Sequence, residues 1–145
     1  MTRRVAEEED GVVRVLLMLF AAYLIVVGLI ALLAPATFFE QIGPFGTRND
    51  HYARDGGTFQ VAIGVAALLA GPRPGWRFPV LLMLALQFAL HAGSHFVDFD
   101  AADPRWLGRA EAVALALTAV LLTYLAVRAG QRDRRSGAGP ARAGL

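Results

Sequence analysis

Residues 12–34 read VVRVLLMLFAAYLIVVGLIALLA, an apolar run that only one charge, Arg14, interrupts. At a helical rise of about 1.5 Å per residue, such a run covers the ~30 Å hydrocarbon core of a bilayer. It is longer than the apolar core of a cleaved signal peptide, which has about 7–15 residues, and no small-residue cleavage site stands before Pro35. The run therefore predicts a transmembrane helix that is not removed.

The composition of the whole chain also indicates a membrane protein. Of its 145 residues, 56% are hydrophobic and 18% are charged, whereas soluble domains have about 45–50% apolar and 25% charged residues. The absence of cysteine excludes disulfides, thiolate metal sites and cysteine nucleophiles. All 14 basic residues are arginines, and most stand at the ends of apolar runs rather than among aromatic residues, so we expect no nucleic-acid binding.

Three further helical segments follow, and together they predict an all-α protein, a polytopic membrane bundle of four transmembrane helices. The predicted spans cover residues 12–34, 49–70, 78–97 and 109–127 of a membrane domain at 12–128. The second span is cleanly apolar only over residues 59–70, so its first turns are polar. A polar helix at that depth is costly unless it faces protein or water.

The segments outside the spans are predicted to be irregular. Residues 1–11 are a charged, mobile N-terminal segment, and residues 129–145 are an Arg/Gly/Ala-rich disordered tail. Residues 35–48 hold two prolines and two glycines, which break helices, and three phenylalanines suited to a membrane interface. Residues 98–108 form an acidic loop with Trp106 at the interface.

The arginines predict the orientation of the bundle. With a cytoplasmic N-terminus, ten arginines lie on the inner side and four on the outer side, as the positive-inside rule favours. The inner arginines are Arg3, Arg4, Arg14, Arg73, Arg77, Arg128, Arg132, Arg134, Arg135 and Arg142, and the outer ones are Arg48, Arg54, Arg105 and Arg109. Both termini are therefore predicted to be cytoplasmic.

In this orientation, histidines and carboxylates gather at the extracytoplasmic end of the bundle. His51 and Asp55 are spaced i, i+4 and share a helix face, as do His91 and His95. The predicted polar cluster comprises His51, Arg54, Asp55, Gln87, His91, His95, Asp98, Arg109 and Glu111. Ionisable residues within a membrane are functional candidates by default, so we expect function to depend on this cluster.

Two chemistries fit the predicted cluster. Imidazole nitrogens and carboxylate oxygens bind zinc, iron or manganese, so His51, His91, His95 and Asp55 are candidate ligands of a divalent metal. The alternative is a network of hydrogen bonds within the bundle. We favour the network, because a His-x-x-x-His pair without an adjacent Glu general base is a weak motif.

The sequence RDGG at residues 54–57 lies near the start of the second span. Adjacent side chains point to different sides of a helix, so we expect Arg54 and Asp55 to pair across helices, with Asp55 as an alternative proton acceptor. Gly56, Gly57 and Gly64 predict close approach of a neighbouring helix. No strand precedes them, which excludes a phosphate-binding loop.

The stretch NDHYARDGG at residues 49–57 and the His91-x-x-x-His95 pair, within residues 12–128, resemble small bacterial integral membrane proteins of the DoxX-like and DUF4345-type groups. The resemblance implies a four-helix membrane bundle. The DoxX name is associated with quinone-linked redox complexes, but no residue here carries that role over. The Arg-only, Ala/Gly/Leu-rich usage resembles that of high-GC bacteria, which implies the inner membrane of a bacterium.

Three functions remain open on the sequence. The first is a binding or accessory protein whose polar end holds a lipid, a quinone-like or other small molecule, or docks a membrane-protein partner. The second is a metal- or haem-binding membrane enzyme that uses His51, His91 and His95. The third, an ion pathway, ranks last because the inner half of every span is almost purely apolar.

Overall fold

The computed structural model describes residues 3–137, and this part of the chain is helical without a β-strand. Its elements are α1 (Arg3–Leu33), α2 (Pro35–Gln41), α3 (Asp50–Ala70), α4 (Pro74–Asp98), the 3-10 helix η1 (Phe99–Ala101) and α5 (Arg105–Gly137). Three of them contain stretches long and apolar enough to cross a membrane, at Asp10–Leu33, Pro74–Ala101 and Arg105–Arg134. The predicted all-helical fold is confirmed for these residues, and three of the four predicted spans coincide with helices of suitable length and composition.

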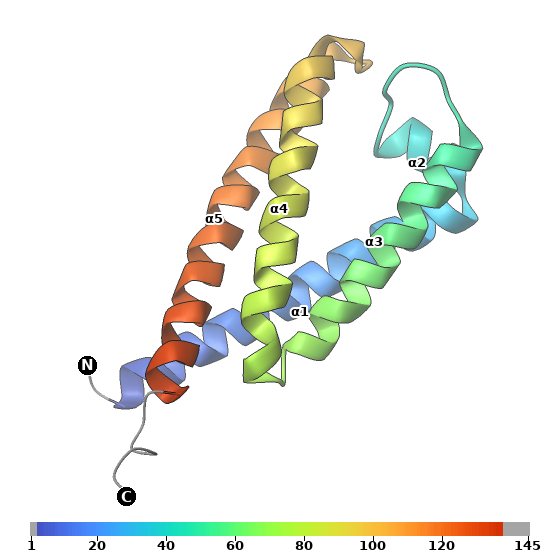
Figure 1. Cartoon of the computed structure of the whole chain (residues 1–145). Coiled ribbons are helices and arrows are strands. Elements are labelled where there is room, and N and C mark those ends of the chain that lie inside the picture. The colour runs from blue at the N-terminus through green and yellow to red at the C-terminus, as the bar shows by residue number, and fades with distance from the viewer. Residues whose placement is uncertain (1–2, 138–145) are drawn as a thin grey trace, which may run out of the picture.

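The four long helices form two pairs that are inclined to each other (Figure 1). α1 packs along α3 and α4 packs along α5, while a smaller contact between α3 and α4 joins the pairs. The start of α1 and the end of α5 lie at one end of the molecule, here called the terminal end. The pairs diverge toward the opposite end, the loop end, where η1 and the segment after α2 lie.

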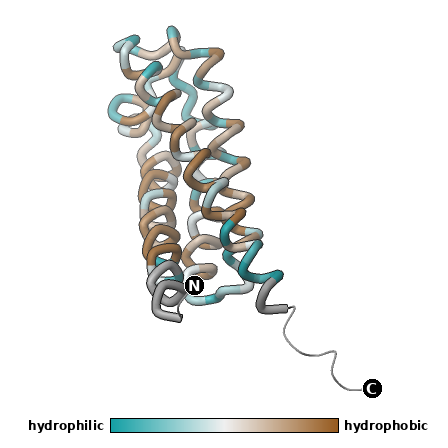
Figure 2. Tube along the Cα trace, turned by 90° about the vertical axis from the view of Figure 1, so that its left-hand side faces the viewer, coloured by the Kyte–Doolittle hydropathy of each residue, from teal (hydrophilic) through white to brown (hydrophobic). Residues whose placement is uncertain are grey.

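The hydrophobic core lies nearer the terminal end. Leu17 of α1, Leu84 of α4 and Leu122 of α5 are all fully buried there. Phe20 meets Phe88 edge to face, with ring centroids 5.8 Å apart. Other large apolar side chains are exposed on the outside of the helices, and Figure 2 shows hydrophobic residues along their middle parts. Such surfaces suit contact with lipid.

A buried arginine connects the helices at the terminal end. Arg77 of α4 is only 5% exposed, and its Nε and Nη2 donate hydrogen bonds to the Gly71 carbonyl oxygen at 3.2 and 2.8 Å. Its Nη1 forms an ion pair with Asp10 of α1. Nη1 of Arg132, on α5, lies 4.0 Å from the same carboxylate. This group, here called the Arg77 clamp, joins three helices and the α3–α4 turn.

Glycines set the close approach of α1 and α3. A Cβ added at Gly57 would lie 2.6 Å from the Gly28 carbonyl oxygen, and one added at Gly64 would lie 2.8 Å from the Ile25 side chain. A Cβ at Gly56 would have nothing within 4 Å. The predicted helix contact is therefore confirmed for Gly57 and Gly64, whereas Gly56 faces outward.

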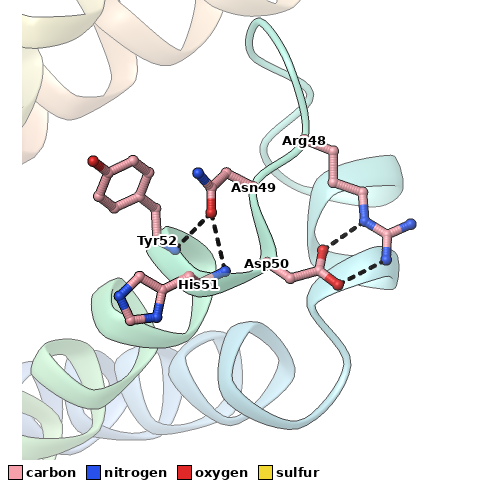
Figure 3. A network of polar contacts seen from close by, with 5 residues as sticks. All are labelled: Arg48, Asn49, Asp50, His51 and Tyr52. Carbon is pink, nitrogen blue, oxygen red and sulfur yellow. Dashed lines mark hydrogen bonds and ion pairs between the residues drawn. The ribbon is translucent and has the colours of Figure 1, made fainter.

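The start of α3 agrees with the predicted second span (Figure 3). The Asn49 side chain caps the helix by accepting hydrogen bonds from the backbone amides of His51 and Tyr52, at 3.1 and 3.2 Å. Arg48 and Asp50 form a two-point ion pair beside the cap, at 2.6 and 3.0 Å. An Asn cap satisfies backbone donors that have no partner within the helix, so α3 begins at Asp50 despite its polar first turns.

Three predicted irregular segments are partly helical. Residues 1–11 were expected to be mobile, but α1 already begins at Arg3, and Asp10 belongs to the Arg77 clamp. α5 continues to Gly137 through the first part of the predicted tail, because Ala129 is buried in the core. The remaining tail residues, 138–145, lie outside the described residues. α2 occupies the first part of the predicted loop, with proline in its first turn, where proline is tolerated.

Candidate functional site

A cavity of about 680 Å³ lies between the two helix pairs, toward the loop end. The pairs diverge there, so their own side chains do not fill the space between them. Every long helix contributes to its lining: Tyr23 and Val27 from α1, Gln60 from α3, His91 and His95 from α4, and Glu111 from α5. The cavity therefore brings polar groups from four separate stretches of sequence together.

His91 and His95 lie one turn apart on the face of α4 that borders the cavity. Their Nε2 atoms are 3.0 Å apart, within hydrogen-bonding distance, and their rings meet edge to face. Nδ1 of His95 lies 3.5 Å from Oε2 of Glu111 on α5. That separation is too long for a hydrogen bond, and the nitrogen is buried without a hydrogen-bond partner. The three side chains form a row from α5 to α4.

A short strap, formed by residues 44–46 and 101–103, lines the cavity at the loop end. Residues 44–46, after α2, run antiparallel to residues 101–103, and Phe45 forms a β-bridge with Ala102. Two backbone hydrogen bonds of 3.1 Å flank this bridge. The Phe45 ring packs edge to face on His95, with centroids 4.7 Å apart. The strap thus holds the helix pairs together at the end where they diverge and positions one of the histidines.

Gln60 supplies a polar group from the opposite wall. Its Oε1 atom is buried and has no hydrogen-bond partner among the described residues. Nearby walls are apolar, with Val27 and Leu115 among the lining residues. An unpaired carbonyl oxygen in such surroundings is costly unless a donor meets it.

The structure brings together part of the predicted polar cluster. His91, His95, Asp98 and Glu111 all line the cavity. Gln87 does not, because it lies on the exposed face of α4. The i, i+4 spacing identified the shared face of the two histidines correctly, and the fourth predicted span supplies Glu111 beside them.

The other members of the predicted cluster lie elsewhere. The His51 side chain is 81% exposed and sits 3.4 Å from Asp55, which is also exposed, on the same helix. Arg54 is exposed on α3 as well. Arg109 forms an exposed ion pair with Asp100 at 3.3 Å. None of these four predicted residues lines the cavity.

The four residues predicted as metal ligands therefore do not converge. Across the residues whose side chains are described, 10–134, no three His, Cys, Asp or Glu side chains form a group that could hold a metal ion. His51 and Asp55 pair with each other on the exposed surface of α3, whereas His91 and His95 face the space between the helix pairs. Similar depth in a bundle does not place residues on facing sides of their helices.

Sequence reasoning missed Gln60, Tyr23 and Phe45 as site residues. Gln60 carried a signal, since it is the one strongly polar side chain in the otherwise apolar run 59–70. Tyr23 is likewise an isolated polar side chain in the first span. Phe45 gave no such signal in the sequence, because its contact with His95 depends on the strap.

A helical-bundle fold does not define a function, which has to be inferred from the chemistry of a site. Among the described residues, the cavity between the helix pairs is a candidate for such a site. Comparisons of the chain with protein-family models, with curated proteins and with solved structures find no match.

Proposed function

We propose that this protein binds a small membrane amphiphile, such as a lipid or a quinone-like molecule, in the cavity between its helix pairs. The observation that supports this proposal is the mixed lining of a single cavity. Val27, Phe38 and Leu115 supply apolar walls, while His91 and Glu111 supply polar groups. A volume of about 680 Å³ falls within the ~300–1,000 Å³ typical of small-molecule sites. An apolar body and a polar head match the two kinds of wall.

Metal binding is the weaker alternative on the same geometry. The two Nε2 atoms, 3.0 Å apart, supply two nitrogen ligands, but structural and catalytic zinc sites use at least three protein ligands. Among the described residues no third group completes the set. The hydrogen bond between His91 and His95 accounts for their contact without an ion.

We expect filling of the cavity to weaken binding. Leu115→Trp places a large ring in the cavity, whereas Val113→Trp, two residues away, lies on an exposed part of α5 (52% exposed). In lipid nanodiscs, radiolabelled 1-dodecanol should bind the native chain saturably, above empty nanodiscs. Leu115→Trp should weaken this binding by about tenfold or more, and Val113→Trp should leave it unchanged. Equal effects of the two substitutions, or no saturable binding to the native chain, would contradict the proposal.

We further propose that all four long helices span the inner membrane of a bacterium, with both termini in the cytoplasm. α3 packs antiparallel along α1 and has 21 residues, a length of about 30 Å. The polar first turns of α3 then lie at the outer surface, and the arginine distribution places the terminal end inside. The resemblance to DoxX-like proteins likewise implies a four-helix membrane bundle.

Reporter fusions should confirm this topology. Alkaline phosphatase, which is active only outside the cytoplasm, should be active when fused after Thr47 and inactive after Pro72 or Leu145. Thr47 precedes α3 and Pro72 follows it, so the first two fusions report directly whether α3 crosses the membrane. Equal activities after Thr47 and Pro72 would show that it does not, and an active Leu145 fusion would reverse the orientation.

A further inference from the structure

We infer that the head group of the bound amphiphile donates a hydrogen bond and carries no negative charge, so that a hydroxylated lipid fits the cavity and a phosphorylated or carboxylated one does not. This inference rests on the proposed function and names its ligand class. It follows from the kinds of polar side chains that line the cavity.

The first observation is the charge of the lining. Asp98 and Glu111 line the cavity, and no arginine is among its described lining residues. Arg109, the closest arginine in sequence to Glu111, is engaged with Asp100 and with the face of the Phe99 ring. An anionic head would therefore meet two carboxylates and no arginine, and burying a charge without a strong counter-charge is unfavourable.

The second observation is a buried acceptor that no donor of the described residues meets. Oε1 of Gln60 is buried in the cavity wall without a hydrogen-bond partner. The Glu111 carboxylate adds two further acceptor oxygens, one of them 3.5 Å from the buried, unpaired Nδ1 of His95. A ligand hydroxyl can satisfy such acceptors, whereas an ether or ester oxygen of the same size cannot.

The third observation is the burial of individual polar atoms in this wall. Oε1 of Gln60 and Nδ1 of His95 are both buried, and the Phe45 ring packs on His95. Hydrogen bonds to buried groups contribute more to selectivity than exposed ones, because unpaired groups there lose their water partners. Head groups should therefore be discriminated by hydrogen-bond chemistry and not by size alone.

Three probes with the same alkyl chain test the inference: 1-dodecanol, its methyl ether and dodecyl phosphate, each measured for saturable binding to the native chain in nanodiscs. The alcohol should bind about tenfold more tightly than the ether, and the phosphate should show no saturable binding. Gln60→Met replaces the amide, and with it the buried acceptor, by an apolar group of similar volume. It should therefore lower the affinity for the alcohol to that for the ether and leave the affinity for the ether unchanged. Gln87→Met, on the exposed face of α4, is the matched control and should keep the preference of the native chain.

The possible failures are distinguishable. If the ether binds the native chain as tightly as the alcohol, or the phosphate binds best, the inferred head group is wrong while amphiphile binding stands. If Gln60→Met keeps the preference for the alcohol, Gln60 is not the acceptor. If none of the three probes binds saturably, the proposed function fails together with the inference. The probe comparison needs only the native chain, so it remains decisive even if a variant does not fold.

Discussion

Gly57→Val is expected to destabilise the protein by about 3 kcal/mol or more, at the upper end of the range for overpacked interiors. The new Cβ would lie 2.6 Å from the backbone oxygen of Gly28. That oxygen belongs to a helical backbone, which cannot move aside as the end of a flexible side chain can. The valine must therefore push α1 and α3 apart along a helix pair whose packing depends on close approach.

Gly56→Val is the matched control for this prediction. The two glycines are neighbours in α3 and undergo the same change in helix propensity, but a Cβ at Gly56 meets nothing within 4 Å. We expect Gly56→Val to change stability by about 0.5 kcal/mol at most, since valine is the better helix former. Reversible unfolding in mixed micelles with increasing dodecyl sulfate would measure both changes. Similar losses for the two variants would refute the assigned helix contact.

Asp10→Asn is expected to cost about 2–4 kcal/mol by leaving the Arg77 guanidinium buried without its carboxylate. Removal of one partner of a buried ion pair typically costs about 3–5 kcal/mol. The lower range applies here because the Asp10 side chain is 49% exposed, so water already screens part of the interaction. The loss should loosen the terminal end first, where the Arg77 clamp joins α1 to α4 and α5.

An exposed ion pair provides the control for the clamp. Asp50→Asn removes a two-point contact with Arg48 whose distances are 2.6 and 3.0 Å, but both partners are exposed, so the expected loss is about 0–1 kcal/mol. The double variant Asp10→Asn/Arg77→Met should recover part of the loss caused by Asp10→Asn, because it no longer buries an unpaired charge. Unfolding midpoints that rank Asp50→Asn as the more harmful change would show that the clamp does not stabilise the bundle.

The helices were largely predictable because hydrophobicity and capping are local properties. The run at 12–34 corresponds to the apolar stretch Asp10–Leu33 of α1. A helix close to the predicted range 49–70 is present as α3, but α3 is not among the three stretches long and apolar enough to cross a membrane. The Asn49 cap at the start of α3, which the structure shows, is a local interaction of this kind. The flanks were not predicted, because residues such as Ala129 are helical through burial against other helices rather than through their own sequence.

The candidate site was likewise predictable only in part. Helical spacing by itself determined that His91 and His95 share a face, and that His51 and Asp55 share another. Only the tertiary structure decided that the first face borders the cavity and that the second is exposed. The rotation of each helix about its axis depends on contacts with its neighbours, such as that between Gly28 and Gly57, and these are long-range in sequence. The sequence therefore predicts the helices and their polar faces, whereas the packing of the helices determines which of those faces meet.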